Sequence, residues 1–363
     1  MAERYPQLVI NTKNLQHNFN CLKEMCRPYG IRITAVVKGF TAVPEACKAL
    51  WDCHPRTVAS SRIDQLAKLK ERYPDMQTEL LRIPGLSECD DVVRFADISL
   101  NSEPLVLQKL NDEAMKQGKV HKVILMKDIG DRREGFESED VLINTACSVE
   151  YGMPGLKLWG IGANFGCYGS ICVSKDKVDW LAEIMEKIEA KIGRQLDVLS
   201  IGGTQSFHNM ALGELNPRVN DIRAGISLIT KAEYTWKEDF PERLDAFRIR
   251  AEIVELKNKP TMPSGVFGAA ALNDERKYVD LGVRKRGILA FGKQDFGGTE
   301  AGLTPLDPQI RIWGSSSDHT MLDLEDCDRD YRLGDIVEFR PNYVVCMYAT
   351  TSPNVKIKIV EEW

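Results

Sequence analysis

The alternation of short apolar runs with segments of helical periodicity is the feature that most constrains this chain. Between residues 32 and 223 the hydrophobic period switches repeatedly between two and 3.6, as it does where strands and helices alternate. The expected strands are residues 32–38, 57–59, 78–83, 97–100, 122–127, 156–163, 197–201 and 220–223. The expected helices are residues 14–26, 44–51, 63–71, 89–95, 104–117, 141–149 and 175–192. Eight strands alternating with helices over roughly 230 residues predict a (β/α)8 TIM-type barrel.

A different texture begins near residue 231, where helical periodicity gives way to extended runs separated by Gly, Pro and Ser turns. The expected strands are residues 247–255, 284–291, 309–313, 335–339, 343–348 and 355–360, with loops at 303–307 and 323–330. We therefore expect residues 1–230 to form the barrel and residues 231–363 to form a mainly-β domain. The strand expected at residues 8–11 is a candidate to pack with that second domain.

Composition excludes several classes of partner. The chain has 48 basic and 53 acidic residues scattered along it, so we expect no basic stripe for nucleic acid or anionic lipid. No apolar run approaches the ~18 residues of a membrane span, and the N-terminus lacks a signal pattern, so we expect a cytoplasmic protein without membrane partners. Ten cysteines without a Cys-x-x-Cys pair, and five histidines without metal-ligand spacing, predict reduced thiols and no metal site.

Lys38 ends a buried, β-branched run and is followed by a glycine. Barrel enzymes keep their active residues at the C-terminal ends of strands, and a lysine there can form a Schiff base with a carbonyl group. On the run alone, a lysine that extends to solvent or pairs with a carboxylate is the commoner outcome. The same rim of the predicted barrel would carry Asp128, Asn164, Gly202 and Arg223.

Two small, hydroxyl-bearing loops follow the last two barrel strands, at residues 202–206 and 224–227. Barrels often bind phosphate at this position, and glycines let backbone N–H groups approach an anion closely. The loops therefore predict a phosphate site. The alternative is that Gly202 and Gly203 only make a tight turn.

Three motifs in order resemble those of the alanine-racemase-like, fold-type III pyridoxal-phosphate enzymes. They are Val36-Val37-Lys38-Gly39, the loop from Asp128 to Gly135 with its Asp-x-Gly-x-x-Arg pattern, and Ile222-Arg223-Ala224-Gly225. The resemblance covers essentially the whole chain. It implies pyridoxal 5'-phosphate as cofactor, a barrel followed by a β-domain, and a head-to-tail homodimer in which the β-domain of one subunit completes the barrel site of the other.

Within this family the chain more closely resembles the ornithine racemases. The stretches that carry this likeness are residues 81–84, 96–103, 119–135, 284–286, 292–295 and 316–319. The likeness implies a racemase of ornithine, lysine or a similar basic amino acid. A decarboxylase or aldolase of the same fold, a non-catalytic protein of pyridoxal-phosphate homeostasis and a barrel enzyme without cofactor remain alternatives, and the residues after 231 argue against the homeostasis protein, which resembles the barrel alone.

The resemblance also implies roles for single residues. Lys38 would hold the cofactor covalently and then move a proton on one face of the substrate Cα, while Arg223 would face the pyridine nitrogen and resist its protonation. Arg133 would lie near the phenolic oxygen of the cofactor or the substrate carboxylate, whereas Arg132 would be solvated. The phosphate would be held by Gly203, Thr204, Gln205, Ser206 and Gly225.

Two positions depart from the family pattern. Asn164 stands where alanine racemases place a histidine against the ring, and Phe267 stands where they place the tyrosine of the opposite face. Phe267 has no proton to transfer, so Asp318 and His319 become the candidates for the second proton transfer.

Other residues of the second region have open assignments. Asp318 could alternatively contact the distal ammonium of the substrate. Asp295 could do the same, and either acid could instead simply close a turn. Tyr343 and Tyr348 lie near the family's tyrosine that contacts the phosphate; the spacing leaves open which of them, if either, does so, with Tyr348 as the candidate.

Overall fold

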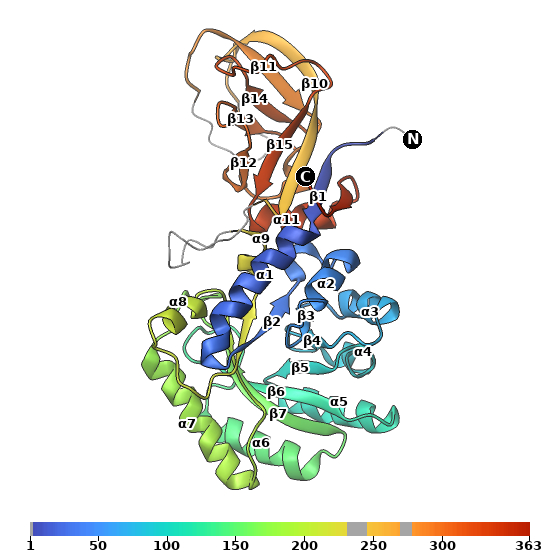
Figure 1. The fold of residues 1–363 in the computed structure, drawn as a ribbon, viewed down its shortest axis with the longest axis vertical. Helices are drawn as coiled ribbons and strands as arrows, with labels where there is room; N and C mark the ends of the chain where they lie inside the picture. The colour runs from blue at the N-terminus through green and yellow to red at the C-terminus, as the bar shows by residue number, and fades with distance from the viewer. Residues whose placement is uncertain (1–2, 231–244, 269–277) are drawn as a thin grey trace. The chain divides into compact units, whose positions relative to one another are not determined.

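The structure, a computed structural model, describes residues 3–230, 245–268 and 278–363, and it divides the chain into two units (Figure 1). One unit is Thr12–Arg243, and the other combines Met1–Asn11 with Leu244–Trp363. The domain boundary predicted after residue 230 adjoins residues 231–244, which lie outside the described residues. Met1–Asn11 belongs to the second unit, in which the strand expected at residues 8–11 was a candidate to pack.

The first unit is a closed barrel of eight parallel strands, and this confirms the predicted fold class. The strands are β2 (Arg32–Val36), β3 (Val58–Ser60), β4 (Thr78–Leu80), β5 (Ile98–Asn101), β6 (His121–Lys127), β7 (Leu156–Ala163), β8 (Val198–Gly202) and β9 (Asp221–Ala224). Pairing of β9 with β2, from Arg32 opposite Asp221 to Ala35 opposite Ala224, closes the barrel. Because the strands are parallel, their C-terminal ends all lie at one rim of the barrel.

Helices occupy the connections between the strands (Figure 1). They are α1 (Thr12–Cys26), α2 (Pro44–Trp51), α3 (Ile63–Arg72), α4 (Cys89–Phe95), α5 (Pro104–Lys116), α6 (Glu139–Gly152), α7 (Lys175–Ile192), α8 (Ser206–Ala211) and α9 (Ile226–Ile229). Their ends follow local chemistry, since a proline opens α2 and α5 and Gly193 ends α7 with a φ of 72°. Ser138 caps α6 by accepting a hydrogen bond from the Val141 N–H.

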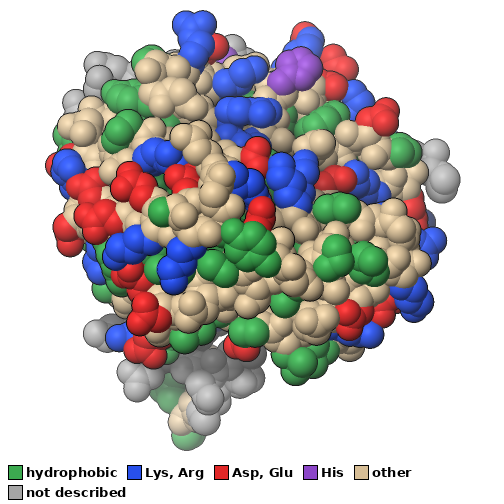
Figure 2. All heavy atoms as spheres, turned by 90° about the horizontal axis from the view of Figure 1, so that it is seen from below, with side chains coloured by type: hydrophobic (Ala, Val, Ile, Leu, Met, Phe, Trp, Pro, Cys, Tyr) green, Lys and Arg blue, Asp and Glu red, His purple; other side chains and the backbone are tan. Residues whose placement is uncertain are grey.

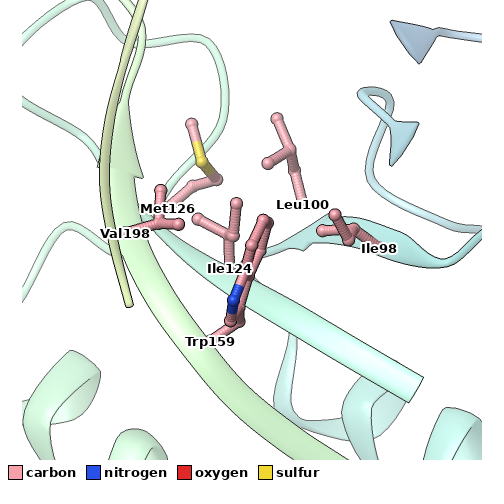
Figure 3. Close-up of a cluster of buried hydrophobic side chains, with 6 residues drawn as sticks. All are labelled: Ile98, Leu100, Ile124, Met126, Trp159 and Val198. Carbon is pink, nitrogen blue, oxygen red and sulfur yellow. The ribbon is translucent and has the colours of Figure 1, made fainter. Parts of the chain in front are cut away.

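One half of the barrel interior is apolar. Figure 3 shows Trp159 of β7 beside Ile124 of β6, with side chains from β5, β6 and β8 around them. The cluster, called the apolar half below, is Ile98, Leu100, Ile124, Met126, Trp159 and Val198, with Leu81 and Ile83 packed against it. These residues recur at alternate positions along their strands, as side chains on one face of a strand do.

The other half of the interior is polar and charged. It is formed by side chains of β2, β4, β8 and β9 and of the residues just before β3. This charged half comprises Thr34, Arg56, Thr57, Glu79, Ser200, Asp221 and Arg223. The two halves meet at Gly162, where an added Cβ would lie 3.3 Å from Met126 Sδ and 3.4 Å from Arg223 Nη1.

The second unit is built on antiparallel sheet, in the order β12-β15-β10-β11-β14-β13, with β1 pairing β10 and β16. The strands are β1 (Gln7–Asn11), β10 (Phe247–Pro260), β11 (Val283–Leu289), β12 (Leu303–Pro305), β13 (Arg311–Ser315), β14 (Thr320–Asp323), β15 (Ile336–Pro341) and β16 (Lys356–Val360). A short helix, α10 (Lys293–Phe296), precedes β12. β1 joins this sheet because it pairs antiparallel with β10 and parallel with β16.

Two predictions for the second unit were wrong, and one of its strands was missed. Residues 343–348, expected as a strand, belong to helix α11 (Tyr343–Thr351), which Asn342 caps by accepting a hydrogen bond of 3.0 Å from the Val345 N–H. The loop expected at 303–307 contains β12. The loop expected at 323–330 is confirmed apart from Asp323, the last residue of β14, and β14 itself was not predicted as a strand. β12 and β14 are short strands held by pairing with longer neighbours, a signal that local sequence does not carry.

The surface carries both signs of charge. On the face seen from below Figure 1, basic side chains alternate with acidic ones and hydrophobic side chains form small groups (Figure 2). Ion pairs between helices contribute to this mixture, for example Lys187 of α7 with Glu139 of α6 at 2.5 Å. Among the described residues, no helix combines the length and the apolar character that crossing a bilayer requires.

Candidate active site at the barrel rim

Lys38 lies directly after β2, where the chain turns into a single 3-10 turn over Lys38–Phe40. The strand end is fixed by the Val37 N–H, which donates to the Ala59 carbonyl at 2.8 Å, and the turn places the side chain at the C-terminal rim. Burial lowers the pKa of the Lys38 amine, and the guanidinium of Arg133 lowers it further. A lysine whose pKa is lowered spends more time as the neutral amine, which is the nucleophilic form.

The loop after β6 delivers Arg133 to the same rim. Asp128 accepts hydrogen bonds from the N–H groups of Gly130 at 2.8 Å and Arg132 at 3.2 Å, so its carboxylate shapes the loop. Gly135 is required because it has a φ of 130° and an added Cβ would lie 2.3 Å from the Asp128 nitrogen. Arg132 is exposed and pairs with Glu137, consistent with a solvated arginine.

Glu134 is a residue of the rim to which the sequence analysis gave no role. Its carboxylate pairs with Arg133 and accepts a hydrogen bond from the Asn164 Nδ2. It also raises the pKa of Lys38, against the effect of Arg133. Because an acidic residue follows Arg133 within the motif, the signal was present in the sequence, but nothing in the pattern said which way the carboxylate pointed.

Arg223, on β9, is buried and connects the rim to the charged half. Its Nη2 donates to the Ala163 carbonyl at 2.7 Å and to the Asn164 Oδ1 at 2.8 Å, and its Nη1 donates to the Ser200 hydroxyl. Gly202 leaves room for the guanidinium, because an added Cβ there would lie 2.8 Å from Nη2. Arg223 also lowers the pKa of Lys38, so the two residues act on one another electrostatically.

The loops after β8 and β9 lie side by side, as the phosphate prediction requires. The Thr204 hydroxyl donates to the Ser227 hydroxyl at 3.4 Å, and Gly203, with a φ of 94°, donates its N–H to the Arg223 carbonyl at 3.2 Å. Gly225 packs on β2, since an added Cβ would lie 3.2 Å from the Val36 Cβ. The loops therefore present hydroxyl groups and backbone close to the strand that carries Lys38.

The two remaining residues of the predicted phosphate set have different surroundings. Ser206 is fully buried, and its hydroxyl donates to the Gly202 carbonyl at 3.1 Å, which fixes the start of α8. The Gln205 amide lies close to Gly166, where an added Cβ would be 2.6 Å from its Nε2. Ser227 was not in the predicted set, although its loop was.

In the second unit, the pair Asp318 and His319 lies in the turn between β13 and β14. Asp318 accepts hydrogen bonds from the Gln294 side chain and, at 2.8 Å, from the Ser317 hydroxyl. The backbone of His319 forms hydrogen bonds with Ser316, and His319 is exposed. The turn therefore presents a carboxylate and an imidazole at the surface of this unit.

Asp295 belongs to the framework of the second unit. It is buried, accepts a hydrogen bond from the Ser352 hydroxyl at 2.9 Å, and accepts another from the Gly292 N–H at the start of α10. This is the turn-closing alternative considered for it. Tyr348 of α11 is 44% exposed and its ring covers Gly297.

Phe267 is 61% exposed, with its ring centroid 5.8 Å from that of Tyr278. The residue predicted to stand at the position of the family tyrosine is therefore accessible but, as a phenylalanine, carries no titratable group.

Comparison with known proteins places the whole chain among amino-acid racemases. Residues 10–232 match the family model of the alanine racemase N-terminal domain. The chain is 36% identical to an ornithine racemase of Acetoanaerobium sticklandii over 98% of this chain and all of that protein, and 33% identical to a lysine racemase of Thermotoga maritima over 97% and 98%. An alanine racemase structure from Clostridium difficile is similar with a TM-score of 0.78 and 18% identity, over 99% of this chain and 97% of that one.

Proposed function

The chain belongs to the family of the alanine racemase N-terminal domain and is an amino-acid racemase, and we propose that its substrate is ornithine, lysine or a similar basic amino acid. The support for the substrate class is that both curated relatives, which match over both units, are racemases of basic amino acids. The observation that carries the chemistry is the Lys38 amine at the barrel rim, half-buried and near two guanidinium groups that lower its pKa.

The residues at the rim fit pyridoxal phosphate as cofactor. Lys38 supplies an amine for an aldehyde, and Arg133 and Arg223 supply permanent positive charge for an anionic ring. The adjoining loops supply the Thr204 and Ser227 hydroxyls together with glycine backbone into which a side chain would not fit. When linked to the substrate amino acid, this cofactor withdraws electrons from Cα and so makes the hydrogen on Cα more acidic.

Lys38 is the proposed proton carrier on one face of the substrate. Burial and the charge of Arg133 both favour the neutral amine, which can accept a proton at Nζ. Arg223 would place a charged guanidinium near the ring nitrogen of the cofactor and resist its protonation, which would disfavour transamination. Arg133, whose charge is partly offset by Glu134, orients the substrate carboxylate or the phenolic oxygen.

Racemisation requires a second proton carrier on the opposite face, because the proton removed from one side is returned on the other. Since Phe267 cannot serve, the proposal assigns this role to Asp318 and His319, which offer a carboxylate and an imidazole in one exposed turn. Within the same proposal, Tyr348 contacts the cofactor phosphate.

A head-to-tail homodimer in the cytoplasm completes the proposal. The second unit exposes apolar side chains at one end of its longest hairpin, with Val266 fully exposed and Phe267 61% exposed, as expected for a surface that a partner covers. All ten cysteines are free thiols, as in a reducing compartment. Mixing the inactive Lys38→Ala and His319→Ala proteins tests the dimer. If each site is built from two subunits, hybrid dimers regain activity; a mixture that stays inactive contradicts shared sites.

The substrate experiment incubates the enzyme and pyridoxal phosphate with each L-amino acid in deuterated water. We expect ornithine or lysine to gain one deuterium at Cα with inversion of chirality, because solvent protons replace the one removed. Chiral chromatography with mass spectrometry measures both changes. Release of carbon dioxide without the D-enantiomer would instead identify a decarboxylase of the same fold.

The cofactor link has its own test in the visible spectrum. Lys38→Arg keeps the charge but cannot form the imine, so it is expected to lose the chromophore near the barrel rim entirely. Lys127→Arg is the matched control, because Lys127 also ends a barrel strand but donates to the carbonyls of Asp128 at 2.6 Å and Glu137 at 2.9 Å. A chromophore that survives Lys38→Arg and disappears in Lys127→Arg would reassign the link.

A further inference from the structure

Glu79 is a fully buried carboxyl for which the proposed reaction has no use. It lies on β4 in the charged half, where its Oε2 accepts a hydrogen bond of 3.0 Å from the Thr57 hydroxyl. Its Oε1 has no hydrogen-bond partner among the described residues. A buried polar atom without a partner is costly, so its persistence in the interior of an enzyme calls for an explanation.

Glu79 is connected to Arg223 through hydroxyl groups and a second carboxylate. Thr57 lies 3.2 Å from the Thr34 hydroxyl, and Thr34 donates to the Asp221 Oδ1 at 2.8 Å. Asp221 accepts a second hydrogen bond from Ser200, and Ser200 in turn accepts one from Arg223 Nη1. The chain of contacts thus runs from β4 through β2 and β8 to the guanidinium at the rim.

This chain accommodates both protonation states of Glu79. The Thr57 hydroxyl has one hydrogen and two acceptors within reach, the Glu79 Oε2 and the Thr34 oxygen. When Glu79 is ionised, Thr57 donates to it. When Glu79 is protonated, its own O–H donates to Thr57, which turns its hydrogen to Thr34, and every later bond in the chain is kept.

The charges around Glu79 make the choice between these states consequential. The charged groups that act on it are Asp221 and Arg223 on β9 and Arg56 just before β3, where Arg56 Nε lies 3.2 Å from the Asp221 Oδ1. With Glu79 ionised, two carboxylates balance two guanidinium groups. With Glu79 protonated, these four side chains together carry one net positive charge. Arg223 is the one of them that lies closest to the rim.

We propose that Glu79 is a positioning residue for Arg223: the proton on its carboxyl sets the charge balance behind the guanidinium and thereby the electrostatic environment of Lys38. Protonation leaves the positive charge of Arg223 less compensated and favours the neutral Lys38 amine. Ionisation compensates Arg223 and favours the charged form. Burial and the charge of Asp221 raise the pKa of Glu79 to about 7, so both states are populated near neutral pH.

The test follows the visible spectrum of the pyridoxal-phosphate-loaded protein between pH 5.5 and 9, and in this form it rests on the proposed function. Wild-type protein is expected to show a spectral transition with a midpoint near pH 7. Glu79→Gln, which keeps the shape and the neutral charge of the protonated acid, is expected to hold the low-pH spectrum throughout. Glu150→Gln is the matched control, because Glu150, on α6, pairs with Arg194 and takes no part in this chain of contacts. The spectral transition of this control variant is expected to match that of wild type.

A second variant keeps the test decisive if Glu79→Gln folds poorly. Thr57→Val preserves shape but removes the hydrogen bond that stabilises ionised Glu79, so the transition is expected to move upward by about one pH unit. An unshifted midpoint in Thr57→Val, or a wild-type transition in Glu79→Gln, overturns the proposal.

A cofactor-free measurement separates this inference from the proposed function. Acetylation of Lys38, followed by mass spectrometry of its peptide as a function of pH, reports the fraction of neutral amine. Above pH 7 the Glu79→Gln protein is expected to label Lys38 several-fold faster than wild type, because the extra positive charge persists. Equal labelling rates overturn the inference even if no chromophore forms, whereas absence of a chromophore in wild type bears on the proposed function alone.

Discussion

The two halves of the barrel interior are held together by different forces. The apolar half packs six buried side chains from β5, β6, β7 and β8, each of which contributes through removal from water, about 1.5–3 kcal/mol for a fully buried aliphatic side chain. The charged half buries two carboxyls and two guanidinium groups that depend on one another. Apolar contacts are independent of pH and tolerate partial loss, whereas a buried charge loses its compensation when one partner is removed.

Both halves therefore contribute to stability, whereas electrostatic control comes from the charged half. Only the charged half reaches the rim through Arg223, which touches Asn164 and lowers the pKa of Lys38. The apolar half faces the same interior but supplies no charged group. Substitutions in the two halves should differ in kind as well as in size.

The largest effect is expected from Arg223→Met. Removing the guanidinium leaves Asp221 and Glu79 buried with less compensation, which is expected to cost about 3–5 kcal/mol in the free energy of unfolding and to alter the spectrum of bound cofactor. Urea unfolding followed by circular dichroism measures the cost. Arg218→Met is the control, since Arg218 pairs with Glu189 at a partly exposed site and should cost less than about 1 kcal/mol. Equal costs for the two variants would show that the charged half is not specially dependent on its partners.

Leu100→Ala is the corresponding change in the apolar half. Leu100 is 1% exposed, and truncating it is expected to cost about 3 kcal/mol through lost burial and the cavity that remains. The pH profile of the cofactor spectrum should not change, because no charged group is touched. Unfolding curves and a pH titration of the same sample measure both quantities. A shifted titration midpoint would mean that the halves are mechanically coupled across Gly162.

This contrast also decides how much of the barrel could be predicted from sequence. Most of the eight strands contain a short apolar or β-branched run, although β9 holds two charged residues. Because side chains of one face recur at every second residue, such runs and the alternation seen in the apolar half can be recognised from pattern. The charged half cannot. Thr34 and Ser200 are ordinary strand residues, and Thr57 directly precedes β3. They meet only because closure of β9 on β2 brings Asp221 beside them.

The candidate site was predictable where a motif carried it. Lys38 and Arg223 were predicted at strand ends, and Arg133 was predicted from the resemblance of its loop to the family motif. The structure brings the three to one rim. Glu134 was missed because the direction of its side chain depends on the loop that Asp128 shapes. Helix α11 was mistaken for a strand because Tyr, Val and Cys favour strands, while the capping Asn342 and the buried spacing of Val345 and Ala349 decide for a helix.

Glu79→Gln probes the charged half through its pH dependence. The pKa of Glu79 is raised from 4.5 to about 7 in the folded protein, so between these values the unfolded chain releases a proton that the folded protein keeps. Wild-type stability is therefore expected to fall by up to about 3 kcal/mol as pH rises from 4.5 to 7, and the loss is complete above 7. Urea unfolding at several pH values, with Glu79→Gln as reference, measures the slope. A wild-type curve parallel to that of the variant would remove Glu79 as the source.

Ile124→Val gives the smallest effect and the cleanest reference for the apolar half. Ile124 is fully buried beside Trp159, and the change deletes one methylene without altering charge or hydrogen bonding. It is expected to cost about 1 kcal/mol, within the 0.5–1.5 kcal/mol typical of this substitution. Because nothing that titrates is removed, the cost should be the same at pH 4.5 and pH 7, measured by urea unfolding at both. A cost that changes across this range would place part of the electrostatic control inside the apolar half. The boundary between the two halves would then have to be redrawn around Met126 and Gly162, where the halves meet.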